Sequence, residues 1–487
     1  MVNIKTLEDI NNLSENVELE CKLAAGRDGK GQLPKDFWPT YSSFANTRGG
    51  VILLGVKEKK GHFSLQGVAE PQRLVTSLFN HLNNPQKVSI NLLTDEDVQI
   101  ITIEERQLIL IHVPAASRHN KPIFLNGNPL QGNTFRRLHE GDRPCDDATV
   151  KRMLAEQVDD SRDRRILPGF DLHDIDIESL HRYRQMLSSL RPDHPWNALP
   201  DQEFLRVQGG FRQDRQSEEK GLTLAGLLMF GQWPSIQEAI PNYFVDYQEQ
   251  GEDKGSHTRW LDRVIPDGTW SGNIFDFFLK ISRKLTADLK VPFLLKGHVR
   301  QDDTLLHRAL REALVNTLVH ADYSDRASIL IKKDPEGFLF RNPGLMRVPT
   351  EQALRGGESD CRNQTLHQLF LMINLGERAG SGLPKIRQGW ESNGGTLRLS
   401  DAFEPYDQTR LEMLWEDIEE KNAGETPGKT TAQILQFLTA TPTMTIPELA
   451  DLLNRSERAV ERAIRKLRQT EKLKRIGPAK GGYWQVL

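Results

Sequence analysis

Alternating apolar and charged residues near the start of the chain predict its first strand. Residues 17–23 read V-E-L-E-C-K-L, and this period of two is typical of a half-buried strand. The residues at 17, 19, 21 and 23 should face inward, with Glu20 and Lys22 on the opposite face. Residues 34–46 then show helical spacing of aromatic side chains, and the apolar run Val51–Leu54 predicts a central strand.

Later segments also show the residue patterns of helices and strands. Residues 305–320, LLHRALREALVNTLVH, predict a strong amphipathic helix, and residues 328–332 predict a strand after it. Near the end of the chain, Thr445 should cap a helix over Ile446–Leu453. A further helix and two short strands around a basic turn follow, which is the pattern of a winged helix-turn-helix.

Length and composition set the number of domains. A chain of 487 residues predicts roughly three or four domains. The fold class is α+β multidomain, and the boundaries fall at 1–155, a connector at 156–290, a third domain at 291–418, a polar linker at 419–430 and a C-terminal domain at 431–487. The net charge of −3 says nothing about partners, so any basic surface must be local.

Several classes of protein are excluded. Three widely separated cysteines argue against a disulfide framework and fit a reducing compartment. The first twenty residues lack the apolar core of a signal peptide, and no apolar run approaches the ~20 residues that span a bilayer. We therefore expect a cytoplasmic protein with no membrane partner.

Carboxylates gather around the first strand. Glu15 and Glu20 lie five residues apart, Lys22 shares a strand face with Glu20, and Glu58 follows the apolar strand. Converging carboxylates can hold Mg²⁺ or Mn²⁺, and a neighbouring lysine can neutralise a phosphate oxygen, which would suit phosphodiester hydrolysis. The alternative is a solvated charged face on an edge strand, which is ordinary in half-exposed sheets.

These residues also carry a resemblance. VELECK, SSFANTRGG and VILLGVKE together resemble the AlbA-like core of Schlafen-family proteins over about residues 12–75, with weaker similarity to about residue 140. The resemblance implies an AlbA-like α/β domain that binds nucleic acid. It also implies that Glu15, Glu20 and Glu58 are the catalytic, metal-binding triad of a nuclease, with Lys22 beside them.

The amphipathic helix holds a second set of polar residues. Glu312, Asn316 and His320 are four residues apart and project from one side. A carboxylate there can orient a water molecule, and an asparagine amide can hold Mg²⁺ against a triphosphate. On spacing alone, an ordinary polar stripe is the better explanation, because Glu and Asn four residues apart are very common on helices.

The order of motifs after this helix resembles a divergent GHKL-type ATPase domain, an α/β sandwich. The helix is followed by H-A-D-Y, R-N-P-G at 341–344, R-N at 362–363 and G-S-G-L at 380–383. The resemblance implies that Glu312 is the catalytic, water-activating residue, that Asn316 is the magnesium ligand, and that ATP is the cofactor. The cofactor-binding residues that it implies are Asn316, His320, Asn342, Gly344, Gly380, Ser381 and Gly382, with Asn342 and Gly344 on the adenine side and the later glycines under the phosphates.

The C-terminal domain is basic in an otherwise near-neutral chain. Residues 426–487 hold 11 Lys and Arg against 5 Asp and Glu, so 11 − 5 gives +6, the local asymmetry that marks nucleic-acid binding. The alternative is a winged helix that contacts protein, with its arginines paired to Glu457 and Glu461. The candidate nucleic-acid contacts are Arg455, Arg458, Arg462, Arg465, Arg468, Lys474, Arg475 and Lys480.

Together these patterns predict an ATP-regulated protein that binds DNA or RNA, forms a homo-oligomer, and acts as a metal-dependent Schlafen-like nuclease. A role in anti-phage defence is implied only by the resemblance. The alternative function is an ATP-sensing DNA-binding transcriptional regulator without nuclease activity. A third possibility is a scaffold whose ATPase-like domain only oligomerises, so whether the protein is an enzyme, as a nuclease or a weak ATPase, stays open.

Overall fold

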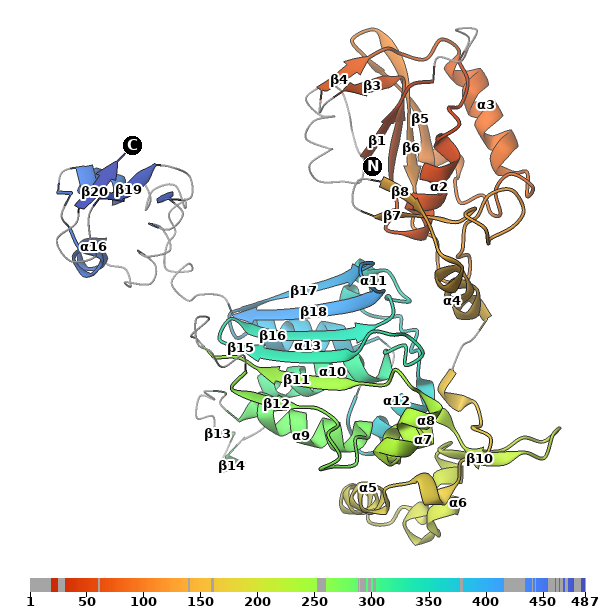
Figure 1. The fold of residues 1–487 in the computed structure, drawn as a ribbon, viewed down its shortest axis with the longest axis vertical. Coiled ribbons are helices and arrows are strands. Elements are labelled where there is room, and N and C mark those ends of the chain that lie inside the picture. Colours follow the sequence, from red (N-terminus) through yellow and green to blue (C-terminus); the bar gives the residue numbers. More distant parts are fainter. Residues whose placement is uncertain are drawn as a thin grey trace. The chain divides into compact units, whose positions relative to one another are not determined.

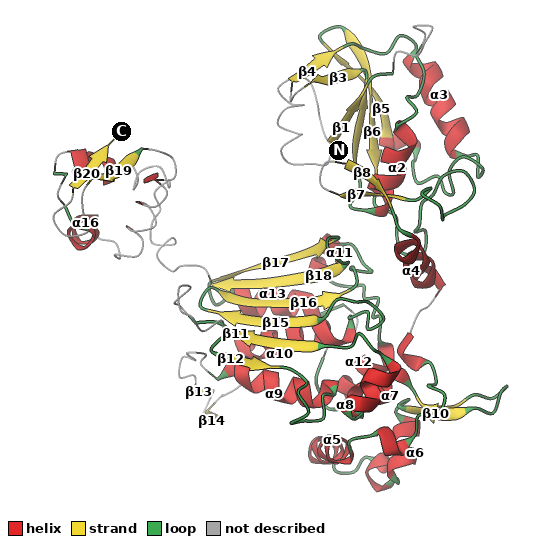
Figure 2. Cartoon of the chain, in the orientation of Figure 1, coloured by secondary structure: helices red, strands yellow, loops and turns green. Residues whose placement is uncertain are grey.

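The computed structural model describes most of the chain in two compact units. The described residues are 19–24, 31–59, 62–138, 141–158, 162–251, 260–287, 289, 295–296, 299–300, 304–376, 380–415, 434–439, 441–442, 444–453, 460, 464, 467–468, 472–476 and 483–486. One unit comprises residues 1–389 and 397–412, and the other comprises residues 390–396 and 413–487. Figure 1 shows the course of the chain, and Figure 2 shows its helices and strands. The described residues confirm the α+β multidomain class.

A four-stranded sheet in the order β1-β2-β6-β5 forms the centre of the first domain. Strand β1 is parallel to β2, whereas β6 is antiparallel to both β2 and β5. Helices α2 and α3 lie on one face of this sheet (Figure 1). The elements are β1 Leu19–Lys22, α2 Phe37–Asn46, β2 Gly50–Leu54, β3 Val56–Lys59, β4 His62–Leu65, α3 Pro71–Leu82, β5 Val98–Ile103, β6 Arg106–Val113, β7 Phe135–Leu138, β8 Gly141–Pro144 and α4 Asp147–Val158.

Strand β2 is buried on both faces, as its uninterrupted apolar sequence predicts. Ile52 and Leu54 pack beneath α2 and α3, in one hydrophobic cluster. Val51 and Leu53 pack with residues of the β3–β4 hairpin in another. The prediction of a central strand is confirmed, and the sheet is therefore fixed from two sides.

The predicted orientation of the first strand is wrong at its C-terminal end. Lys22 is buried with 5% exposure, whereas Leu23 is 41% exposed. The ammonium group of Lys22 contacts Glu20 at 3.1 Å and Asp36 at 2.8 Å, so its charge is compensated where it is buried. Because the strand ends at Lys22, the period of two no longer sets the orientation of Leu23.

A six-stranded sheet in the order β12-β11-β15-β16-β18-β17 forms the centre of the ATPase-like domain. Strand β11 is parallel to β15, and β15 is antiparallel to β16. Helices α9 and α10 lie on one face of the sheet (Figure 1). Strands β11 and β12 belong to the range 156–290 that the sequence assigns to the connector.

The connector and this domain contain the next helices and strands of the chain. They are α5 Ile177–Leu190, α6 Asp201–Val207, β9 Phe211–Gln213, β10 Lys220–Leu222, α7 Leu224–Phe230, α8 Trp233–Ala239, β11 Val245–Glu249, β12 Asp262–Val264, α9 Ile274–Thr286, β13 Leu295–Lys296, β14 Val299–Arg300, α10 Leu305–Val319, β15 Ile329–Asp334, β16 Gly337–Pro343, α11 Thr350–Arg355, α12 Gln364–Met372, α13 Gly382–Glu391, β17 Gly395–Ala402 and β18 Gln408–Trp415.

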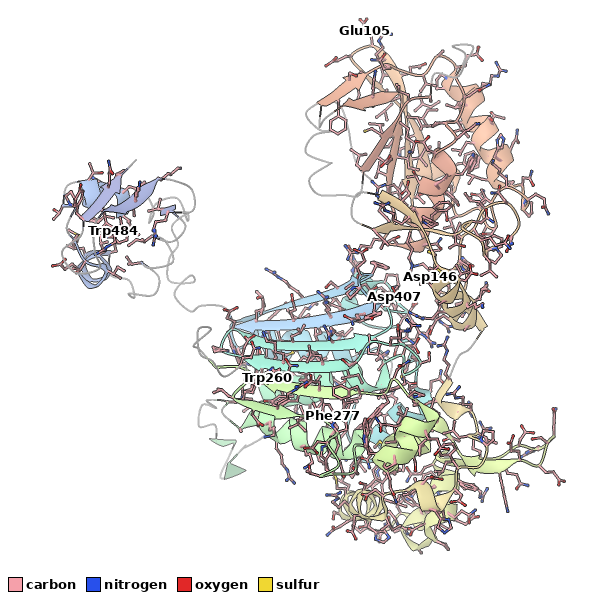
Figure 3. The ribbon with its side chains drawn as sticks, viewed as in Figure 1. Glu105, Asp146, Trp260, Phe277, Asp407 and Trp484 are labelled. Carbon is pink, nitrogen blue, oxygen red and sulfur yellow. The ribbon has the colours of Figure 1, made fainter. Side chains whose placement is uncertain are left out.

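The C-terminal part contains helix α16 Ile446–Leu453 and the hairpin of β19 Leu473–Ile476 with β20 Tyr483–Val486. The predicted cap of α16 is confirmed, since Thr445 and Glu448 exchange hydrogen bonds in a capping box. Trp484, labelled in Figure 3, is 5% exposed and belongs to the small hydrophobic core of this part. The predicted linker 419–430 lies outside the described residues.

Candidate nucleotide and nucleic-acid sites

Helix α10 positions the polar residues that the sequence singles out. Thr304 caps the helix, its side chain accepting a hydrogen bond from the amide of His307 at 3.5 Å. The helix ends at Val319 with His320 as its C-cap residue. Glu312, Asn316 and His320 all line one pocket, which confirms that their four-residue spacing places them on one side.

This pocket also brings together residues that are distant in sequence. Asn342 at the end of β16 lines it, and so do Gly380 and Gly382 at the start of α13. Gly344 and Ser381 are neighbours of these residues in the chain but are not themselves among the lining residues. Five of the seven predicted cofactor-binding residues therefore converge on one cavity: Asn316, His320, Asn342, Gly380 and Gly382.

Gly382 lies so close to α10 that no side chain fits there. A Cβ atom at Gly382 would stand 3.1 Å from Asn316 Nδ2 and would overlap the carboxylate of Glu312. Gly380 has φ +68°, and a Cβ there would overlap the backbone of Glu358. A backbone this close to the polar face of α10, at the start of a ten-residue helix, fits the phosphate groups of a nucleotide.

His320 is held in its neutral form. Burial lowers its pKa to about 3, and the positive charges of Arg362 and Arg347 and the ring of His367 act in the same direction. An uncharged imidazole at the pocket can accept as well as donate a hydrogen bond. His320 is therefore suited to contact a polar ligand without adding positive charge.

An ion-pair network that the sequence did not reveal holds one wall of the pocket. Arg347 and Arg362, which both line the pocket, contact the two carboxylate oxygens of Glu156 on α4 at 2.8 Å and 3.1 Å. Burial raises the pKa of Glu156, but Arg362, Arg347 and Arg162 together bring it below its usual value. The carboxylate therefore stays ionised among the arginines.

The same wall is held from the first domain. Arg118, in the segment between β6 and β7, donates its Nε hydrogen bond to Asp360, which also lines the pocket. Arg118 Nη1 donates to the backbone oxygen of Glu156 at 2.7 Å. No local spacing relates Arg118, Glu156 and Asp360, so only the fold could reveal that they meet.

The enclosed space of the pocket is small. It amounts to about 90 Å³, whereas small-molecule sites usually measure about 300–1,000 Å³. Movement of a wall would therefore give a nucleotide more room. The wall formed by Arg347, Asp360 and Arg362 is the part held by α4 and Arg118.

The predicted metal triad is described only in part. Glu15 lies outside the described residues, and Glu58 lies on β3 with its side chain outside them. Glu20 is described, and its two oxygens contact Lys22 at 3.1 Å and Arg137 at 2.8 Å.

The described side chains around Glu20 do not fit a metal ion. No group of three or more metal-binding side chains occurs within the described residues. Both oxygens of Glu20 are already neutralised by cations, and Arg137 continues to Asp142 at 3.0 Å. This arrangement is an ion-pair network that links β1, β7, β8 and Asp36, the N-cap residue of α2, and it gives Lys22 a partner on each side.

The C-terminal basic residues are also described in part. Arg455, Arg458, Arg462, Arg465 and Lys480 lie outside the described residues, whereas Arg468 and Lys474 are exposed. Arg475 lies over the ring of Trp484, 4.8 Å from its centroid. Since successive strand residues face opposite sides, Lys474 is directed away from this packed face.

Comparison with known families gives four successive matches. Residues 15–146 match the Schlafen, AlbA_2 family, and residues 151–246 match a domain of unknown function. Residues 336–400 match a family described as the C-terminal part of the ATP-dependent DNA helicase recG, and residues 430–483 match the HTH domain. These domains, in the order that the sequence predicts, define a multidomain nucleic-acid-binding protein with an ATPase-like domain.

One solved structure is similar along nearly the whole chain. It is the crystal structure of the DIP2311 protein from Corynebacterium diphtheriae, which is 20% identical, with 96% of this chain and 92% of that chain covered and a TM-score of 0.40. That likeness is too low to carry an argument. No curated protein matches. No helix of the described residues is long and apolar enough to cross a membrane.

Proposed function

We propose that this protein is an ATP-gated nucleic-acid-binding protein. The observation that carries the proposal is the double attachment of one pocket wall: Arg347, Asp360 and Arg362 line the pocket, and their partners are Glu156 on α4 and Arg118 of the first domain. Any ligand that displaces this wall must also disturb the contacts that reach the AlbA-like domain.

The residues of the pocket support a nucleoside triphosphate as the ligand. Asn316 would hold the magnesium ion that accompanies the phosphates, and the backbone at Gly380 and Gly382 would lie beneath them. Asn342 also lines the pocket, and its amide would contact the base. When bound, the nucleotide supplies a triphosphate charge and a cleavable phosphoanhydride bond.

Nucleotide binding and the closed wall of the pocket would be thermodynamically linked. The pocket is small in the arrangement described, with Glu156 between the two arginines, so this arrangement favours the nucleotide-free state. A ligand that binds the opened pocket shifts the equilibrium by its preference for that state. The AlbA-like domain and the helix-turn-helix then supply the nucleic-acid contacts whose affinity depends on the nucleotide.

The proposal is tested by binding measurements on the full chain. ATP is titrated into the wild type, Asn316→Ala and the control Asn84→Ala, in which an exposed asparagine of the first domain is changed. We expect Asn316→Ala to bind ATP at least about tenfold more weakly, since it loses a metal ligand. Binding of labelled DNA and RNA is then followed with and without ATP. Equal nucleic-acid affinity in both conditions would contradict the gating.

Cleavage of nucleic acid by the first domain is a separate proposal that rests on the Schlafen-type sequence. The described contacts of Glu20 favour ion pairing, so a nuclease would need Glu20 to exchange Lys22 or Arg137 for a cation. Incubating tRNA, single-stranded DNA and duplex DNA with Mn²⁺ and either wild type or Glu20→Gln tests it. Cleavage that Glu20→Gln abolishes supports a nuclease; absent or unchanged cleavage leaves the ATP-sensing regulator.

A further inference from the structure

A polar cavity of about 310 Å³ lies between the connector and α12, away from the nucleotide pocket. Three arginines line it: Arg164 of the short helical turn after α4, Arg206 near the end of α6, and Arg212 on β9. All three are exposed, so their guanidinium groups are reachable from solvent. None of these residues takes part in the nucleotide pocket.

Gln208 is a buried polar residue of this cavity with an unsatisfied end. It is only 2% exposed, and its Oε1 lies 2.9 Å from the hydroxyl of Tyr183. Its Nε2 atom is buried without any hydrogen-bond partner among the described residues. An unpaired buried amide costs about 1–3 kcal/mol. Because the Nε2 atom is covered, a ligand in the cavity pairs with it only after the side chain turns outward, which would relieve this cost.

The N-terminus of α12 opens into the same cavity. Gln364 and Thr365, its first two residues, line the cavity, and no acceptor is found for their backbone N–H groups among the described residues. Asp163 accepts the next N–H group, that of Leu366, at 2.8 Å. Two N–H groups at the end of this nine-residue helix therefore remain for another acceptor, while the Asp163 carboxylate offsets part of the positive charge there.

The charge that remains in the cavity is positive. Arg206 is partly neutralised by Glu203, which is 2.7 Å away. Arg212 donates to the backbone oxygen of Arg164 at 3.3 Å, and its positive charge also acts on the exposed carboxylate of Asp214. Near the end of α6, the carbonyl oxygens of Phe204, Arg206 and Leu205 accept from Gln208, Gly209 and Gly210.

We propose that this cavity binds a phosphate monoester, the end of a nucleic-acid strand or a free nucleotide. Guanidinium groups and helix N-termini are both suited to phosphate oxygens. A monoester carries a charge of about −1.5 to −2 near neutral pH, which suits the cavity better than the single charge of a phosphodiester or a carboxylate. The domain of unknown function would then recognise strand ends or nucleotides.

The experiment compares ligands that differ only in this group. Binding of a 5′-phosphorylated oligothymidylate is measured against the same strand with a 5′-hydroxyl, and thymidine monophosphate represents the free nucleotide. The full-length Asn316→Ala protein is used, so that the nucleotide pocket does not contribute to the measured binding. We expect the phosphorylated strand, the monophosphate or both to bind, and the phosphorylated strand to bind at least about fivefold more tightly than its hydroxyl counterpart if strand ends are recognised.

Variants assign the effect to the cavity. Arg164→Ala and Arg212→Ala change exposed residues and should remove most of the preference, whereas the exposed neighbour Arg165, which does not line the cavity, serves as the control in Arg165→Ala. Gln208→Leu should weaken binding as well, and the arginine variants keep the test valid if it does not fold. Absence of both monophosphate binding and a 5′-phosphate preference would overturn the proposal. So would a preference that survives both Arg164→Ala and Arg212→Ala.

Discussion

The carboxylate of Glu156 lies 3.1 Å from Nε of Arg362, and its second oxygen lies 2.8 Å from Nε of Arg347. Arg362 is 5% exposed at its side chain, and its Nη2 donates to the backbone oxygen of Leu345 at 3.0 Å. One acidic residue of α4 thus fixes two basic residues of the nucleotide pocket. The position of α4 and the shape of the pocket are therefore linked.

Glu156→Gln should loosen this wall and change two measurements in opposite directions. Removing one partner of a buried ion pair costs about 3–5 kcal/mol of stability, so the melting temperature should fall. The apparent affinity for ATP should rise by up to about tenfold, because less of the protein remains in the closed arrangement. Thermal unfolding and ATP titration measure the two effects.

The control for this variant is Glu70→Gln, which breaks an exposed pair with Arg73. Such pairs contribute about 0–1 kcal/mol, so neither measurement should change appreciably. If Glu156→Gln lost stability and bound ATP more weakly than the wild type, the network would be a support for the pocket and not a restraint on it.

His320 should make the protein less stable as the pH falls below about 6.5. Its pKa is about 3 in the folded chain and about 6.5 when it is exposed. The unfolded chain therefore binds the proton more tightly, and stability declines between these values by up to about 1.4 kcal/mol per pH unit. Carboxylates such as Glu156, with a lowered pKa, add a similar loss only below about pH 4.5.

The pH range from about 5 to 6.5 separates the two effects. There His320→Gln should show a shallower decline of unfolding free energy than the wild type, whereas His173→Gln, at a residue whose side chain is 95% exposed, should not. Denaturant titrations at several pH values measure the slope. Equal slopes for wild type and His320→Gln would show that the imidazole is not held neutral.

Gly382→Ala should prevent nucleotide binding without unfolding the domain. Its Cβ atom would overlap Glu312 and stand 3.1 Å from Asn316 Nδ2, so the two functional side chains would be displaced. We expect ATP affinity to fall at least about tenfold. Gly141→Ala is the control, because its Cβ would meet only the end of the Arg143 side chain, at 3.4 Å. Retained ATP binding in Gly382→Ala would contradict the assignment of the phosphate region.

The placement of Glu312 and Asn316 on one side of a helix could be predicted from a short-range pattern, whereas their meeting with Gly382 was implied only by the resemblance to the GHKL-type domain. A helical period places the first two on one side, and a glycine-rich turn before a helix marks the third. The Thr445 cap was predictable for the same reason. Such patterns hold wherever local sequence alone decides the geometry.

The burial of Lys22 and the role of Glu156 could not be predicted. An alternating strand does not show whether its polar face meets water or, as here, Asp36 and Arg137 of other elements. Nothing in the local sequence marks Glu156, because its role depends on contact with Arg347 and Arg362. Ion pairs between distant segments depend on the complete fold and have no spacing of their own.

Arg136 and Asp407 form a second attachment between the first domain and the ATPase-like domain. Both side chains are 8% exposed, and the two hydrogen bonds between them measure 2.7 Å and 2.9 Å. The backbone oxygen of Asp407, which Figure 3 labels, accepts from Gly344 at 2.9 Å, two residues after Asn342, which lines the pocket. We expect a double-mutant cycle with Arg136→Ala and Asp407→Ala to give a coupling energy of about 1–3 kcal/mol.

Chemical denaturation of the wild type, the two single variants and the double variant measures this coupling. The same cycle on Arg73→Ala and Glu70→Ala, an exposed pair in the first domain, should give less than about 1 kcal/mol. Strictly additive effects of Arg136→Ala and Asp407→Ala would mean that the attachment contributes nothing to the stability of the larger unit.

The C-terminal domain should contact DNA through Lys474 rather than Arg475. Lys474 is exposed, whereas Arg475 packs on Trp484 and serves the hydrophobic core. If Lys474 neutralises one phosphate, Lys474→Ala should lower the slope of log affinity against log salt by about 0.9. Arg475→Ala should mainly lower the melting temperature, because it exposes the face of the indole.

Fluorescence anisotropy at several salt concentrations measures the slopes, with exposed Lys280 of α9 changed in the control Lys280→Ala. An unchanged slope in Lys474→Ala, together with an unchanged slope in Arg468→Ala, would mean that this domain binds protein through its basic surface.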